Sequence, residues 1–146
     1  MRGQRYNLEV TELFTVYEFI SDSPKGEIVK LVKYTKVGIG NTYNLGFGDK
    51  IGDTDEFDDM IVTDNSDGLK VLSTVAGTIY SFTDAYPKSM VFAVGSTPSR
   101  TRLYRIGISN NLSEIKEDFN VFGYLKNQWT PFEKNQNYEA FLIVRK

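Results

Sequence analysis

Hydrophobic and polar residues alternate along the first fifty positions of the chain, which is the pattern of β-strands that bury one face. The alternating segments are residues 6–10, 13–19, 28–37 and 43–47. The first two form one bent strand or a hairpin, and turn residues at 24–26 and 38–41 separate the later ones. We therefore expect an antiparallel meander at the start of the chain.

The spacing of apolar residues changes to that of a helix over positions 69–82. Apolar side chains recur there every three or four positions, at Leu69, Leu72, Val75, Ala76, Ile79 and Phe82. Ser66 or Asp67 provides the N-cap, and Tyr86-Pro87 ends the helix.

The second half of the chain continues with a strand, two helices and two strands. A continuous apolar run over 90–94 predicts a central strand that is buried on both faces. Thr97 caps a second helix with Pro98 in its first position, and residues 109–111 separate it from a third, shorter helix. The closing strands cover 121–125 and 138–144, around a loop with Trp129 and Pro131.

These elements predict a single α+β domain that spans residues 1–146. Their order is β-β-β-(β)-α-β-α-α-β-β, where the bracketed element is a short strand at 60–62. The sheet is mainly antiparallel, and two to three helices accompany it. A length of 146 residues, with 40% apolar and 25% charged residues, is ordinary for one globular domain.

The chain contains no histidine and no cysteine. This excludes Ser-His-Asp and Cys-His catalysis, thiol redox chemistry and the usual zinc sites. We therefore expect neither a metal nor a cofactor, and favour a protein that is not an enzyme. The net charge of −2 argues against general nucleic-acid binding. No apolar run reaches the roughly 18 residues of a membrane-spanning helix, and no signal peptide is visible, so we expect a cytoplasmic protein without a membrane partner.

Acidic residues concentrate between positions 49 and 67, where eight carboxylates accompany a single lysine. The simplest interpretation is a solvated loop. A carboxylate-held Mg²⁺ or Ca²⁺ ion stays an alternative, although no ligand spacing supports it. Basic residues gather elsewhere, at 25–36 and at 100–105.

The most informative segment is 95–105, which links the strand at 90–94 to the second helix. Small hydroxyl residues are followed there by Arg100, Arg102 and Arg105, and strand–helix junctions of this composition commonly hold anions. On a helical wheel Arg102 and Arg105 lie about 60° apart and share a solvated face. Arg100 instead falls inside the apolar arc and in the first turn, where a cation opposes the helix dipole.

Two interpretations account for Arg100. In the structural one it forms a buried ion pair, most simply with Asp49. In the functional one it binds an anion together with the first-turn amides and the nearby hydroxyl groups. The candidate ligand-binding residues are Ser96, Thr97, Ser99, Arg100, Arg102, Tyr104, Arg105 and Asp49.

Several motifs resemble those of a known but uncharacterised family. They are Tyr17-Glu18-Phe19, Pro24-Lys25-Gly26, the stretch 43–49, Lys70-Val71-Leu72, Gly95-Ser96-Thr97 and the stretch 100–104. Together they are similar to a family of small single-domain proteins of unknown function from Bacteroidetes-type bacteria. The resemblance implies a bacterial cytoplasmic protein, carries no activity, and implies that 48–49 and 95–105 face each other.

Three classes of function remain open. The first is a binding or regulatory module that holds an anionic ligand or the acidic segment of a protein partner. The second is a histidine-independent, toxin-like enzyme that cleaves RNA with Arg100, Arg102, Tyr104 and Lys70. The third is a structural or oligomerising protein, a homo-oligomer included, whose arginines are paired internally.

Overall fold

The computed structural model describes residues 4–11, 13–58 and 67–146 of the chain. Within these ranges eight strands form one sheet, and three helices accompany it. The strands are β1 (Glu9–Val10), β2 (Val16–Ser23), β3 (Gly26–Lys36), β4 (Thr42–Asp49), β5 (Met90–Ala93), β6 (Phe119–Leu125), β7 (Gln128–Pro131) and β8 (Ala140–Arg145). The helices are α1 (Gly68–Ala85), α2 (Pro98–Asn110) and α3 (Leu112–Asp118). The predicted α+β class is confirmed.

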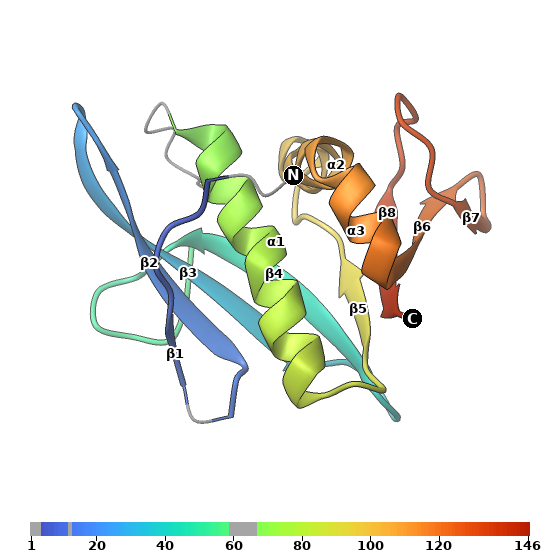
Figure 1. Cartoon of the computed structure of the whole chain (residues 1–146), viewed down its shortest axis with the longest axis horizontal. Helices are drawn as coiled ribbons and strands as arrows, with labels where there is room; N and C mark the ends of the chain where they lie inside the picture. Colours follow the sequence, from blue (N-terminus) through green and yellow to red (C-terminus); the bar gives the residue numbers. More distant parts are fainter. Residues whose placement is uncertain (1–3, 12, 59–66) are drawn as a thin grey trace.

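The sheet has the strand order β1-β2-β3-β4-β5-β8-β6-β7. Its neighbours run antiparallel except β4 and β5, which are parallel. A parallel pair needs a crossover connection, which α1 supplies. Figure 1 shows α1, α2 and α3 on the same face of the sheet, so this face holds the core.

The core forms where alternate residues of the strands meet α1. Tyr34 of β3 stacks on Phe82 of α1 with ring centroids 4.1 Å apart, and its hydroxyl shares a 2.8 Å hydrogen bond with Oγ1 of Thr78. Burial raises the pKa of the Tyr34 phenol well above its ordinary value of 10.0. The helix predicted over 69–82 is confirmed as α1, with Asp67 as its N-cap.

The prediction that β5 is buried on both faces is wrong. Val91 and Ala93 face the helices and are fully buried, whereas Met90 keeps 37% of its surface exposed and Phe92 is half-buried. The reason is that all three helices pack on one side of the sheet (Figure 1). An apolar run in the sequence does not reveal that its second face is uncovered.

Strand β7 replaces the loop predicted around Trp129. Lys126 and Asn127 connect β6 to β7 and have positive φ angles of 53° and 62°, which is the backbone of a two-residue hairpin turn. Such turns are recognised from Asn-Gly or Asp-Gly pairs, and this one lacks glycine. The short strand predicted at 60–62 lies outside the described residues.

Residues 50–58 fold back over the face of β4 that is turned away from the helices. The ring of Phe57 lies on Gly46 and Gly48: a Cβ at Gly46 would lie 2.5 Å from its Cζ, and a Cβ at Gly48 would lie 2.8 Å from a backbone carbonyl oxygen. Both positions therefore require glycine. Phe47, between them, points to the opposite face, so the end of β4 is covered on both sides.

Candidate functional site

The segment 95–105 forms the start of α2, as its sequence predicts. Oγ1 of Thr97 accepts a 3.2 Å hydrogen bond from the backbone N–H of Arg100, and Pro98 occupies the first turn. The backbone N–H of Gly95 donates to Oγ1 of Thr101 at 3.0 Å. A Cβ on Gly95 would collide with the backbone of α2, so glycine is needed where the loop turns into the helix.

Arg100 is buried, with 6% of its surface exposed. Its Nη2 donates a hydrogen bond to the carbonyl oxygen of Phe47 in β4. The last residue of β4 that pairs with β5 is Leu45. Arg100 therefore donates its hydrogen bond to the edge of β4 beyond the point where the pairing with β5 ends. The guanidinium carbon lies 6.0 Å from the ring centroid of Phe47 and 5.9 Å from that of Phe57. The arginine is thus held against two aromatic rings.

The ion pair expected between Arg100 and Asp49 is not formed. Asp49 instead accepts a 2.5 Å hydrogen bond from Nζ of Lys30, its direct cross-strand neighbour in the register of β3 and β4. The two segments do face each other as the resemblance implies, since a Cβ on Gly48 would lie 3.4 Å from Nη2 of Arg100. Nη1 of Arg100 is buried without a hydrogen-bond partner in the described part of the chain.

Arg102 and Arg105 line an open pocket of about 520 Å³ between the start of α2 and the segment before β8. Its polar lining consists of Ser96, Thr97, Thr101, Arg102, Arg105, Asn137, Tyr138 and Glu139. The predicted shared face of Arg102 and Arg105 is therefore confirmed. Four of the eight candidate residues line this pocket, whereas Arg100 and Asp49 lie at the end of β4.

The side chains that line this pocket carry a net positive charge. Arg105 donates a hydrogen bond to Oδ1 of Asn137. The exposed Arg102 side chain makes no hydrogen bond or ion pair within residues 4–11, 13–58 and 67–146. Among the described residues that line the pocket, Glu139 is the one carboxylate. Two guanidinium groups therefore face a single carboxylate.

The other two candidate residues do not line the pocket. Tyr104 is buried, donates a 3.2 Å hydrogen bond to the carbonyl oxygen of Leu45 and packs edge-on against Phe47, with centroids 5.5 Å apart. Ser99 is exposed on the first turn of α2. Sequence reasoning missed Asn137 and Glu139, because nothing in the local pattern of a loop marks which helix it will approach.

A family model matches residues 2–146 of the chain. The chain belongs to DUF6934, a family of unknown function. This membership confirms the resemblance to an uncharacterised family, while the bacterial source stays a prediction. A comparison with curated proteins finds no match. A comparison with solved structures finds none either. Any function of this DUF6934 chain must therefore be argued from its own residues.

The residue set of the RNA-cleaving hypothesis is scattered in this DUF6934 fold. Nζ of Lys70 lies 4.1 Å from the ring centroid of Tyr6, and Lys70 lines a different pocket from Arg102. The hydroxyl of Tyr104 is buried in the core. Among the described residues, no group of three or more carboxylates is arranged to hold a metal ion. No helix in those ranges is long and apolar enough to cross a membrane.

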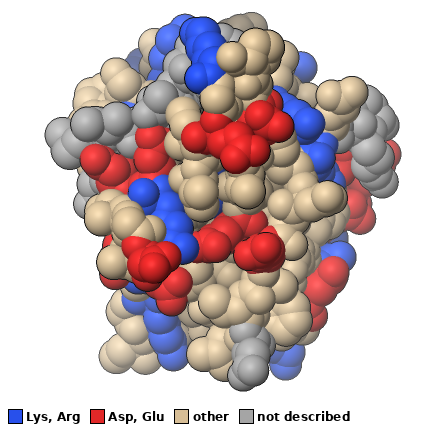
Figure 2. Space-filling view, turned by 90° about the vertical axis from the view of Figure 1, so that its left-hand side faces the viewer, with Lys and Arg blue, Asp and Glu red and all other residues tan. Residues whose placement is uncertain are grey.

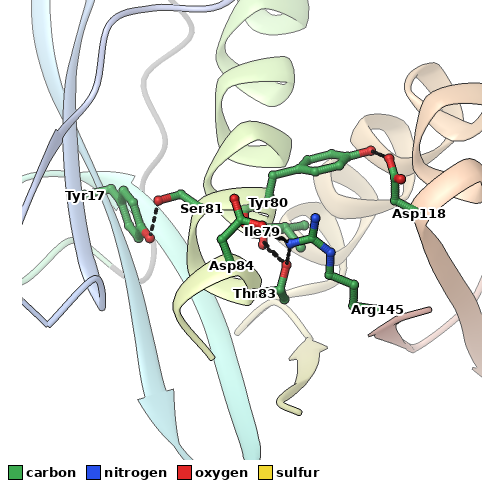
Figure 3. Close-up of polar contacts among 8 residues, drawn as sticks. All are labelled: Tyr17, Ile79, Tyr80, Ser81, Thr83, Asp84, Asp118 and Arg145. Atoms are coloured by element: carbon green, nitrogen blue, oxygen red, sulfur yellow. Dashed lines mark hydrogen bonds and ion pairs between the residues drawn. The ribbon is translucent and has the colours of Figure 1, made fainter. Parts of the chain in front are cut away.

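A second polar cluster of the DUF6934 chain lies along the last turns of α1 (Figure 3). Its hydrogen bonds join Tyr17 to Ser81, Tyr80 to Asp118, and Arg145 to Thr83 and Asp84. These contacts tie α1 to β2, α3 and β8. Burial raises the pKa of Tyr17, and its hydrogen bond to Ser81 opposes that rise. Each of these side chains forms a hydrogen bond with another one, so the cluster stabilises the position of α1.

Proposed function

We propose that this chain is a binding module that holds a small anion, bearing a carboxylate or phosphate group, in the pocket beside α2. The observation that carries the proposal is that Arg102 and Arg105 line one pocket beside the start of a helix. Of the residues that the structure describes, a single carboxylate, from Glu139, shares the lining. The pocket therefore has a net positive charge before any ligand arrives.

The chemistry of the pocket supports an oxyanion as ligand. Guanidinium groups bind carboxylates and phosphates through planar pairs of N–H donors. The hydroxyl groups of Ser96 and Thr97 lie in the same lining, and the start of α2 adds the positive end of the helix dipole. A volume of about 520 Å³ lies within the usual range for small-molecule sites.

The geometry favours binding over catalysis. Arg100 is engaged with the Phe47 carbonyl, and the Tyr104 hydroxyl with the Leu45 carbonyl. Neither side chain is among those that line the pocket. A cytoplasmic location and a bacterial source go with this proposal, and cell fractionation tests the first of them.

Isothermal titration with inorganic phosphate and with citrate, at constant ionic strength, tests this function. We expect saturable binding that Arg102→Ala weakens about tenfold, the loss of roughly one charge-assisted hydrogen bond. Lys88→Ala is the matched control, because Lys88 is exposed on the turn after α1 and its loss changes the net charge equally. Equal weakening by both variants would mean that only overall charge matters, and would contradict the proposal.

A further inference from the structure

A second pocket, of about 700 Å³, lies on the far side of the molecule from α2. Most of its floor is the face of β2 and β3 that is turned away from the helices, and Phe19 of β2 and Lys70 of α1 line its edge. The N-terminal segment 6–9 forms one wall, and residues 50–53 form the other. Figure 2 faces this side of the molecule and shows acidic side chains gathered over it.

The floor of this groove is apolar at its centre. Ile20 and Val29 are direct cross-strand neighbours and keep 48% and 40% of their surfaces exposed. Leu8 of the wall adds a third apolar side chain. These two large β-branched side chains lie side by side on a solvent-facing sheet. A partner that covers them would lower the free energy by removing apolar surface from water.

Carboxylates surround this apolar centre. The lining contains Glu9, Glu18, Asp22, Glu27 and Asp53 against the two lysines Lys50 and Lys70. Lys50 is ion-paired with Glu18 and also feels the charge of Asp53, and Lys70 lies over the ring of Tyr6. The five carboxylates still outnumber the two lysines. The groove is therefore strongly negative.

Two of these carboxylates are placed unfavourably for the isolated protein. Asp22 and Glu27 stand directly opposite each other in the register of β2 and β3, and like charges in that position destabilise a sheet. Both side chains are exposed, and neither forms an ion pair with another residue in the described part of the chain. A cation between them would remove this repulsion.

We propose that this groove docks a protein segment that carries both apolar and basic side chains. The apolar side chains would cover Ile20 and Val29, while lysine or arginine side chains would reach Asp22 and Glu27. Charge complementarity selects a basic segment over an acidic one, and the exposed apolar pair selects a peptide over a simple cation. This inference is independent of the anion pocket, which lies beside α2.

Fluorescence anisotropy with a dye-labelled, terminally capped KVKVK peptide tests the docking. We expect saturable binding, with the serine version KSKSK several-fold weaker and the acidic version EVEVE not bound. The double variant Asp22→Asn/Glu27→Gln should weaken KVKVK about tenfold. It removes the like-charge pair, so it should fold at least as well as the parent, which thermal melting checks.

Matched variants distinguish binding in the groove from the effects of overall net charge and of exposed apolar residues elsewhere. Glu117→Gln/Glu133→Gln changes the net charge by the same amount at exposed positions elsewhere, and should leave the peptide affinity unchanged. Ile20→Thr should weaken binding about threefold, whereas Val37→Thr, at a turn residue that is 44% exposed, should not. Arg102→Ala should also have no effect, so failure of the anion pocket and failure of the groove are distinguishable.

Three results would overturn the docking proposal. One is equal weakening by both charge-matched double variants. Another is spermine competing as well as KVKVK while KSKSK binds equally, which would make the groove a site for simple polycations. The third is a dimer in sedimentation experiments that excludes the peptide and dissociates in Asp22→Asn/Glu27→Gln. The groove would then be occupied by a second copy of this chain.

Discussion

Replacing Arg100 by methionine removes a cation from the interior while keeping most of its apolar stem. The structure assigns this side chain a stabilising contact across the fold, through the Phe47 carbonyl and the rings of Phe47 and Phe57. Arg100→Met leaves that carbonyl without its donor. We therefore expect the free energy of unfolding to fall.

The magnitude follows from the contacts. A buried acceptor that loses its partner costs about 1–3 kcal/mol, and each cation–π contact adds about 0.5–1 kcal/mol. Removal of the buried Nη1, which has no hydrogen bond from the described residues, recovers part of this. The expected net loss is about 2 kcal/mol. Arg102→Met is the matched control: it makes the same change two residues later, at an exposed position, and should alter stability by no more than about 0.5 kcal/mol.

Urea unfolding followed by circular dichroism measures both variants, with the slope m expected to stay constant. Arg100→Met with unchanged or increased stability would refute the structural role of Arg100. Phosphate titration of the same two variants adds a second test. Arg102→Met should lose affinity and Arg100→Met should keep most of it, provided that Arg100 serves the fold and Arg102 the ligand.

Three further predictions follow from single contacts. Gly46→Ala should destabilise the fold by about 1–3 kcal/mol in urea unfolding, because its Cβ would lie 2.5 Å from the ring of Phe57; unchanged stability would show that Phe57 does not cover Gly46. Tyr34→Phe should cost about 1 kcal/mol at pH 7 through the lost bond to Thr78. Because the pKa of Tyr34 is raised above 10.0 in the folded state, the neutral phenol stabilises the fold fully below pH 10, and this stabilisation is lost as the pH rises further. Between pH 8 and 11 the free energy of unfolding should therefore fall less in Tyr34→Phe than in the parent protein. Glu139→Gln should tighten phosphate binding several-fold by removing the one carboxylate of the pocket lining, and unchanged or weaker binding in calorimetry would contradict this placement.

Helical periodicity was sufficient to separate the three arginines. Arg102 and Arg105 share a face that lines the pocket and Arg100 falls in the apolar arc, because one backbone geometry fixes all three directions. The cap at Thr97 and the start of α2 follow from equally local rules. These features depend on neighbours within about one turn of helix, which the sequence displays directly.

The partners of these arginines could not be predicted in the same way. Asp49 pairs with Lys30 because the hairpin register places them opposite each other, and that register depends on the length of the turn between β3 and β4. The donor–acceptor contact of Arg100 with Phe47 spans 53 positions and involves a backbone carbonyl, which has no signature in a sequence. Asn137 reaches the pocket from a loop, where no periodicity constrains direction.

Mapping of backbone amide shifts by NMR during a phosphate titration tests most directly whether the pocket beside α2 is an anion site. We predict saturable shifts at Ser96, Thr97, Arg102 and Arg105 that disappear in Arg102→Ala/Arg105→Ala, while the amides of β2 and β3 stay unchanged. Shifts that are absent, that grow linearly with phosphate, or that persist in the double variant would contradict the site.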